Sequence, residues 1–353
     1  MNAKAVLAAA LLVPTFAVSA AGDPKPKMQW GEYLAAMERS DQETRVCRFA
    51  LRGVPALTYY DATQAIEKGS PCRMAVVVIH GWGGGFIRSK SQAALLDELP
   101  RMQVFRDAPP LVVAPLFPRA DLAEKGFVSV PAELAVWNRS WAQGSCVDLT
   151  KSGSPGDDWR GGGDAEGTTL SSYDVIDRIF AVLADRSLYP NIEKVALAGF
   201  SAGGQFVGRY AAVGKGVVRE GVKVVYAAMS PSTELLFDPK TRWHYGLKDR
   251  PRYAAGLSAA EIMANLSSRR VWRGCGSEDV LGRPHTSLDS CPEAMAQGVN
   301  RFDRFRNFEA YLKGFPEWSR CVSFHVFEGL GHKSAIAFRD KALLGFLAEG
   351  IIN

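Results

Sequence analysis

Short, continuous apolar runs recur along this chain, and they restrict its fold more than any other feature of the sequence. The runs lie at residues 74–79, 111–115, 195–198 and 222–229. Runs without polar alternation are typical of strands buried on both faces of a parallel sheet. Helical periodicity separates them at 173–185 and 205–213. We therefore expect an α/β protein with a mostly parallel central sheet and helices on both faces.

The two ends of the chain add further elements to this sheet. We expect two last strands and a closing helix at 270–273, 322–327 and 341–351. Near the beginning we expect a short helix over 28–39 and a strand pair at 46–51 and 56–60.

The first 21 residues have the pattern of a secretory signal peptide. Lys4 precedes an apolar run, and small residues end it at Ala20 and Ala21. The run is interrupted by Pro14 and is shorter than the ~20 residues that span a bilayer. We expect a secreted or periplasmic protein without a membrane span, in which residues 22–353 form one domain.

The charge of the chain argues against a nucleic-acid-binding protein. A chain of 353 residues with a formal charge of +5 has no basic cluster that would indicate nucleic-acid binding. The arginines of 301–306 are interpreted as a solvated helix face. Insertions near 137–169 and 233–267 interrupt the alternation of strands and helices, and we expect them to cover the carboxyl edge of the sheet, where open α/β sheets bind substrates.

Six cysteines in an exported chain predict disulfides. Cys47 and Cys72 bracket the expected strand pair and are the favoured couple. Cys275 and Cys291 are the nearest option among the others. No zinc-type spacing occurs, so neither a metal nor a cofactor is expected.

The sharpest motif is Gly199-Phe200-Ser201-Ala202-Gly203, which directly follows an expected strand and precedes an expected helix. This context is required of the G-x-S-x-G nucleophile elbow, in which a tight turn projects the serine hydroxyl from the sheet. The helix then points its amino end at the serine, which favours a developing anion.

A glycine-rich segment, His80-Gly81-Trp82-Gly83-Gly84-Gly85, follows the expected strand 74–79. Acyl transfer needs main-chain donors for the oxyanion, and a loop at this place supplies one of them. Trp82 is the first choice and Gly83 the second, with Ala202 as the other donor. His80 is interpreted as a structural histidine that forms hydrogen bonds.

A serine hydroxyl needs a base and the base needs a carboxylate. His332 follows the last expected strand, whereas His325 lies inside that strand and His244 and His285 lie in insertions or loops. The turn after 270–273 offers Asp279, with Glu278 as the alternative. Serine, acid and histidine then follow in the chain order of α/β-hydrolases.

On these motifs the chain resembles the α/β-hydrolase superfamily over nearly all of its mature length. It is also similar to a group of secreted bacterial and fungal hydrolase-like proteins, through 198–205, Arg209-Tyr210-Ala211, Ser230-Pro231-Ser232 and 243–247. The resemblance implies a serine hydrolase acting on a small-molecule or polymeric ester. A peptidase or amidase with the same triad, and a non-catalytic binding protein of this fold, remain open, as does the oligomeric state.

Two further groups have weaker patterns. Trp137 and Trp141 fit a packed helix face better than a substrate pocket. The carboxylates of Asp157, Asp158, Asp164 and Glu166 fail the EF-hand spacing and are interpreted as a solvated acidic loop rather than a calcium site.

Overall fold

The fold is described from a computed structural model of the chain. It covers residues 69–81, 94–95, 98–117, 135–137, 158–281 and 288–351, and the backbone of four short strands between residues 28 and 129. In this part of the chain, eight strands form one sheet in the order β10-β9-β8-β7-β4-β5-β3-β2. The strands from β10 to β5 pair in parallel. They are β4 (Met74–Ile79), β5 (Leu111–Pro115), β7 (Lys194–Phe200), β8 (Lys223–Met229), β9 (Arg270–Gly276) and β10 (Val322–Phe327).

One edge of the sheet is antiparallel. Strands β2 (Arg45–Arg48) and β3 (Tyr59–Ala62) form the expected pair, and β3 continues onto β5. The helix expected to begin at residue 28 is wrong at its start, because β1 (Met28–Gln29) pairs in parallel with β6 (Val128–Ser129). Residues 30–39 lie outside the described part.

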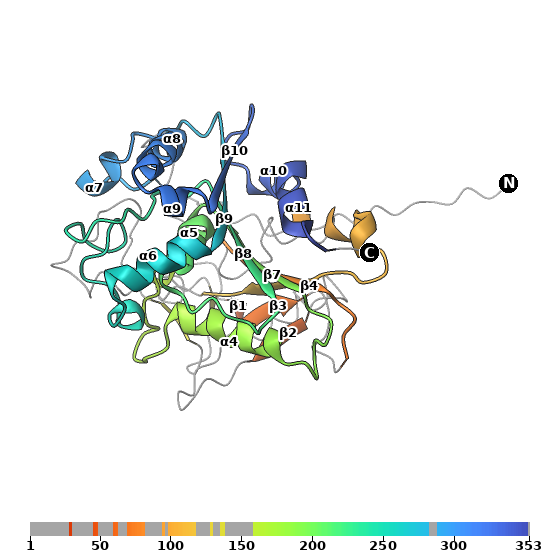
Figure 1. Cartoon of the computed structure of the whole chain (residues 1–353). Helices are drawn as coiled ribbons and strands as arrows, with labels where there is room; N and C mark the ends of the chain where they lie inside the picture. Colours follow the sequence, from red (N-terminus) through yellow and green to blue (C-terminus); the bar gives the residue numbers. More distant parts are fainter. Residues whose placement is uncertain are drawn as a thin grey trace.

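Two layers of helices cover the sheet because alternate strand residues point to opposite faces. Val77 and Ile79 pack in one apolar cluster with α4 (Ser172–Ala184), α5 (Ala202–Val213) and α6 (Ala259–Ser268). Val76 and Val78 pack in the other cluster with α11 (Lys341–Ala348). Figure 1 shows α11 on the side of the sheet away from α4 and α6. The prediction of a mostly parallel sheet with helices on both faces is confirmed.

Short helices and 3-10 turns complete the described fold. They are α7 (Pro292–Met295), α8 (Arg301–Tyr311), α9 (Pro316–Ser319) and α10 (Ser334–Ala337), with 3-10 turns η1 (Leu99–Arg101), η2 (Gln103–Phe105), η3 (Trp159–Gly161), η4 (Arg252–Ala254) and η5 (Leu312–Gly314). Among the described residues, no helix is both long and apolar enough to cross a membrane.

The interpretation of 301–306 as a solvated helix face is right for Arg306, which is 56% exposed, and wrong for the other two arginines. Arg301 and Arg304 in α8 are 2% and 1% exposed. They share one face of the helix with Phe305 and Phe308, which are also buried. Arg304 is held there by main-chain oxygens, since it donates to the carbonyls of Gly298, Ser232 and Asp289.

The expected disulfides do not form among the described cysteines. Cys72, Cys275, Cys291 and Cys321 all lack a disulfide bond. Hydroxyl groups contact two of these thiols instead. The Tyr245 hydroxyl donates to the Cys291 sulfur at 3.3 Å, and the Ser230 hydroxyl oxygen lies 3.7 Å from the Cys275 sulfur. Both expected pairs, 47 with 72 and 275 with 291, are therefore wrong for this structure. Cys146 and the side chain of Cys47 lie outside the described residues.

Candidate active site

Ser201 lies on the turn between β7 and α5, as the strand–turn–helix pattern predicts. Its backbone has φ 60° and ψ −117°, a conformation that non-glycine residues rarely adopt and that costs free energy. Two main-chain hydrogen bonds hold it there. The Ser201 amide donates to the Met229 carbonyl at the end of β8, and the Gln205 amide donates to the Ser201 carbonyl. Within the described chain its side chain caps none of the first amides of α5, so the hydroxyl is not engaged by its own helix.

The glycines of the elbow are required by close approach. A Cβ on Gly199 would lie 2.4 Å from the main chain of Gly203. A Cβ on Gly203 would lie 2.3 Å from the Ile79 carbonyl oxygen at the end of β4. Because these neighbours are backbone atoms, they cannot move aside as a side chain could. Only glycine therefore fits at these two positions of the elbow.

The loop after β4 begins beside the elbow. A Cβ on Gly81 would lie 3.9 Å from the carbonyl oxygen of Phe200, the residue before Ser201. His80 has the structural role expected of it: its Nε2 accepts from the Phe117 amide at 3.1 Å, and its Nδ1 lies 2.8 Å from the Gly81 carbonyl oxygen. Trp82 and Gly83 lie outside the described residues. Ala202, the other expected donor, is the first residue of α5.

The turns after β9 and β10 are joined by main-chain hydrogen bonds. The amides of Ser277 and Glu278 donate to the carbonyls of Phe327 and Leu330. A Cβ on Gly276 would lie 1.9 Å from the Leu330 carbonyl oxygen, so only glycine fits at the end of β9. Parallel strands end at the same edge of a sheet. These hydrogen bonds therefore bring the turn that carries Asp279 into contact with the loop that carries His332.

Asp279 and His332 meet at this contact. The Nδ1 atom of His332 lies 2.7 Å from Oδ2 of Asp279, whose side chain is 1% exposed. Glu278, the alternative acid, is exposed. The structure therefore brings Asp279, not Glu278, to the histidine. A buried carboxylate at this position accepts a hydrogen bond from Nδ1–H of the imidazole. The other ring nitrogen, Nε2, is then unprotonated and can act as the base.

The imidazole of His332 also lies beside the elbow. Its ring centroid is 4.7 Å from that of Phe200, which immediately precedes Ser201. Burial lowers the pKa of His332 below its usual value, the hydrogen bond to Asp279 opposes this, and the positive charge of Arg301 adds to the lowering. Burial thus favours the neutral imidazole, the form that a general base needs, although the side chain is still 30% exposed.

Arg301 is a residue of the site that sequence reasoning missed. Its Nη1 lies 3.7 Å from Oδ1 of Asp279, and both side chains are buried. The signal that could have found it is the spacing of Arg301, Arg304, Phe305 and Phe308, which places two arginines on the apolar face of α8.

The acidic loop before α4 is only partly solvated: Glu166 is exposed as expected, Asp158 is buried, and Asp157 lies outside the described residues. Asp158 is 3% exposed and forms a buried ion pair with Arg160, which in turn donates to Gln205 in the first turns of α5. Asp164 pairs with Arg252 at 2.8 Å. In the part of the chain that is described, no cluster of three or more His, Cys, Asp or Glu side chains could hold a metal ion.

Trp137 is packed in the core, although not on a helix. It forms an isolated β-bridge with Ala165, and its indole nitrogen donates to the Gly163 carbonyl at 3.0 Å. Trp141 lies outside the described residues.

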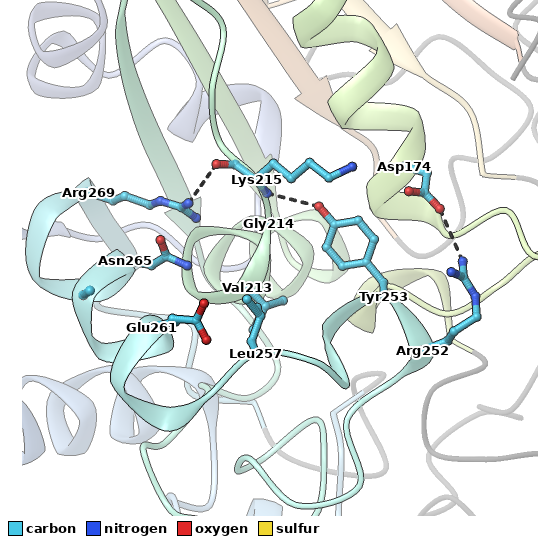
Figure 2. Close-up of a pocket in the computed structure, with 11 residues that line it drawn as sticks. Asp174, Val213, Gly214, Lys215, Arg252, Tyr253, Leu257, Glu261, Asn265 and Arg269 are labelled. Carbon is cyan, nitrogen blue, oxygen red and sulfur yellow. Dashed lines mark hydrogen bonds and ion pairs between the residues drawn. The ribbon is translucent and has the colours of Figure 1, made fainter. Parts of the chain in front are cut away.

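A pocket of about 530 Å³ opens at the other end of α5 from Ser201 (Figure 2). Its charged side chains have protein partners. Lys215 pairs with Asp177, Arg252 with Asp174, and Arg269 donates to carbonyls at the end of α5. The hydrogen bonds of Arg269 satisfy carbonyls in the last turn of the helix, which is a structural role. The pocket therefore does not compete with the triad as the reactive centre.

Comparison with known proteins supports this architecture. No protein-family model and no curated protein matches the chain. Among solved structures, the chain is similar to poly(aspartic acid) hydrolase-1 from Sphingomonas sp. KT-1, with a TM-score of 0.57, 19% identity and coverage of 87% of this chain and 98% of that one. It is likewise similar to LpqC, a poly(3-hydroxybutyrate) depolymerase from Bordetella parapertussis, with a TM-score of 0.57, 20% identity and coverage of 89% and 98%. The protein has the α/β-hydrolase fold.

Proposed function

With this fold as the premise, we propose that the protein is a serine hydrolase that cleaves carboxylic esters through an acyl-enzyme on Ser201. The observation that carries the proposal is the contact of His332 with the buried carboxylate of Asp279 beside the strained turn of Ser201. A strained backbone at a serine and a histidine that contacts a buried acid have no shared structural purpose, whereas a nucleophile elbow with a Ser-His-Asp triad uses all of them.

In this mechanism the Ser201 oxygen attacks the ester carbonyl carbon while its proton passes to Nε2 of His332. Asp279 accepts a hydrogen bond from Nδ1–H of His332 and stabilises the imidazolium that forms. The tetrahedral intermediate collapses by expelling the alcohol, which takes the proton from His332. Water then attacks the acyl-enzyme, again with His332 as the base, and the carboxylic acid is released.

Main-chain amides supply the oxyanion stabilisation. The Ala202 amide at the start of α5 is one donor, and its helix contributes a partial positive charge. We assign the second donor to Trp82 or Gly83 in the loop after β4. Removing one donor of this kind typically costs about 3 kcal/mol of transition-state stabilisation.

The bond that is cleaved is the finer part of the proposal. Both similar structures are named as hydrolases of polymers, one of a polyamide and one of a polyester. At this identity the fold does not distinguish the two bond types. We favour the ester because the better leaving group makes smaller demands on the acid role of His332, and either a small-molecule or a polymeric ester fits the proposal.

A matched substrate pair tests this. We expect the purified protein to hydrolyse p-nitrophenyl acetate and butyrate, to react with a fluorophosphonate probe, and to lose both properties in the Ser201→Ala variant. Faster turnover of peptide anilides than of esters would replace the esterase assignment with an amidase. A wild-type protein that neither reacts with the probe nor turns over either substrate would indicate a non-catalytic binding protein.

We also propose that the protein is exported, on the signal-peptide pattern of residues 1–21. Mass spectrometry of the protein recovered from periplasm or medium would show the mature start near residue 21 or 22. Recovery only from the cytoplasm with the leader intact would contradict export.

A further inference from the structure

The Asp279 carboxylate has two side-chain partners, one on each oxygen: His332, which is 30% exposed, and Arg301, which is buried. Oδ2 accepts from the imidazole of His332 at 2.7 Å, and Oδ1 lies 3.7 Å from Nη1 of Arg301. The second distance is an ion pair rather than a hydrogen bond. The exposed fractions of the Arg301 and Asp279 side chains are 2% and 1%, so little water screens the pair.

The helix that carries Arg301 is docked on the acid turn. The Phe302 amide in the first turn of α8 donates to the Asp279 carbonyl at 3.3 Å. Asn300 caps the same turn by accepting from the Asp303 amide at 2.8 Å. These hydrogen bonds place the backbone of Arg301 beside the acid turn, and its side chain is buried against Asp279.

Arg301 changes the charge balance of the site. A buried carboxylate alone is negative, and protonating its histidine would neutralise it. With Arg301 present, the three side chains sum to zero charge while His332 is neutral, and a proton on the imidazole makes that sum positive. Because Asp279 and Arg301 are buried and weakly screened, the guanidinium repels this proton, which is held less tightly although the imidazole itself is 30% exposed.

Asp279 and Arg301 are the charged groups that act on His332. Arg301 is faced by the carboxylates of Asp279 and Asp289 and by the thiol of Cys275. Glu278 and Lys333, the chain neighbours of the pair, are exposed to solvent.

We propose that Arg301 is a positioning residue of the triad: it holds the Asp279 carboxylate so that one oxygen faces His332, and its charge offsets part of the carboxylate's attraction for a protonated imidazole. The inference rests on the proposed function for its meaning, although the interaction itself can be measured without turnover. It assigns to the first turn of α8 the control of the pH range in which the base works.

The direct test is the titration of His332 by nuclear magnetic resonance in the inactive Ser201→Ala protein. Replacing Arg301 by Met or Gln removes a positive charge that lowers the pKa of His332, and we expect the titration midpoint to move upward by about one pH unit, the size of an interaction between nearby unit charges that water partly screens. Gln keeps a donor for Asp279, so R301Q serves if R301M does not fold. R306M is the matched control, because Arg306 is on the same helix but 56% exposed. We expect it to leave the midpoint unchanged.

The pH dependence of kcat/KM separates the effect of the Arg301 charge from that of the shape of its side chain. In the active enzyme, R301K should keep the acid limb of kcat/KM near its wild-type position, whereas R301M or R301Q should move it upward by the same amount as the titration. A midpoint that does not move in R301M or R301Q, or that moves equally in R306M, overturns the inference. Failure of the proposed function would show differently, as an unlabelled wild-type protein whose His332 titration still responds to Arg301.

Discussion

Replacing Asp279 by Asn tests the candidate site most directly, because the structure assigns this carboxylate two partners at once. The substitution preserves size and removes one negative charge. An Asn amide that donates toward His332 would fix the wrong tautomer, with the proton on Nε2 and no base facing Ser201. We therefore expect D279N to lose activity and stability together.

The magnitudes follow from the contacts. A mis-set tautomer and loss of the imidazolium partner lower kcat by about 10⁴-fold, equivalent to about 5 kcal/mol of transition-state stabilisation. The same change leaves the guanidinium of Arg301, 2% exposed, without its nearest carboxylate. Breaking a buried pair costs about 3 kcal/mol or more, which is a large part of the stability of an ordinary domain.

The assay is steady-state hydrolysis of p-nitrophenyl acetate alongside urea unfolding, with Glu278→Gln as the control because that neighbouring carboxylate is exposed. E278Q should match the wild type in both measurements. Activity of D279N within tenfold of wild type, combined with a large loss in E278Q, would refute the assignment of the acid and the reasoning from burial that supports it.

The remaining predictions concern pH, packing and thiols. The lowered pKa of His332 places the acid limb of kcat/KM below pH 6.5, since activity is lost only where the imidazole binds a proton; a pH–rate profile with its midpoint above that value would contradict this. Gly203→Ala should destabilise the fold by about 1–3 kcal/mol through its clash with a strand carbonyl. Gly345→Ala, in α11 with open space around its Cβ position, should stabilise by about 0.5–1 kcal/mol, and equal effects of the two in urea unfolding would argue against the packing described. Burial raises the pKa of the Cys72 thiol and raises that of Cys275 to about 12, so both should react with Ellman's reagent only after unfolding; peptide mapping that finds either in a disulfide would contradict the structure.

Most of the sheet could be predicted from local pattern. The expected strands 74–79, 111–115 and 322–327 have the observed bounds, because their apolar runs end where the strands do. The helix expected at 205–213 begins at Ala202, since periodicity does not reveal a helix start that lies inside a glycine-rich turn. The buried face of helix α8 was harder to predict, because its charged residues resemble those of a solvated surface until the partners of Arg301 and Arg304 are known.

The disulfide predictions were wrong for the same reason, because they too depend on contacts between distant parts of the chain. An even count and an export signal describe a class of proteins, not the distance between two sulfur atoms. Cys275 and Cys291 are 16 positions apart in sequence, yet each contacts a different side chain, Ser230 and Tyr245 respectively. Which thiols could meet depends on the packing of strands that are distant in the chain.

The sequence by itself determined the alternation of strands and helices and the glycine spacing around Ser201, because these depend on backbone sterics and on neighbours a few positions away. It also indicated the order of serine, acid and histidine. Only the tertiary structure decided between Asp279 and Glu278, and only it brought Arg301 to the carboxylate. Adjacent residues in a turn point in different directions, and the burial and charge that select one of them come from elements far away in the sequence.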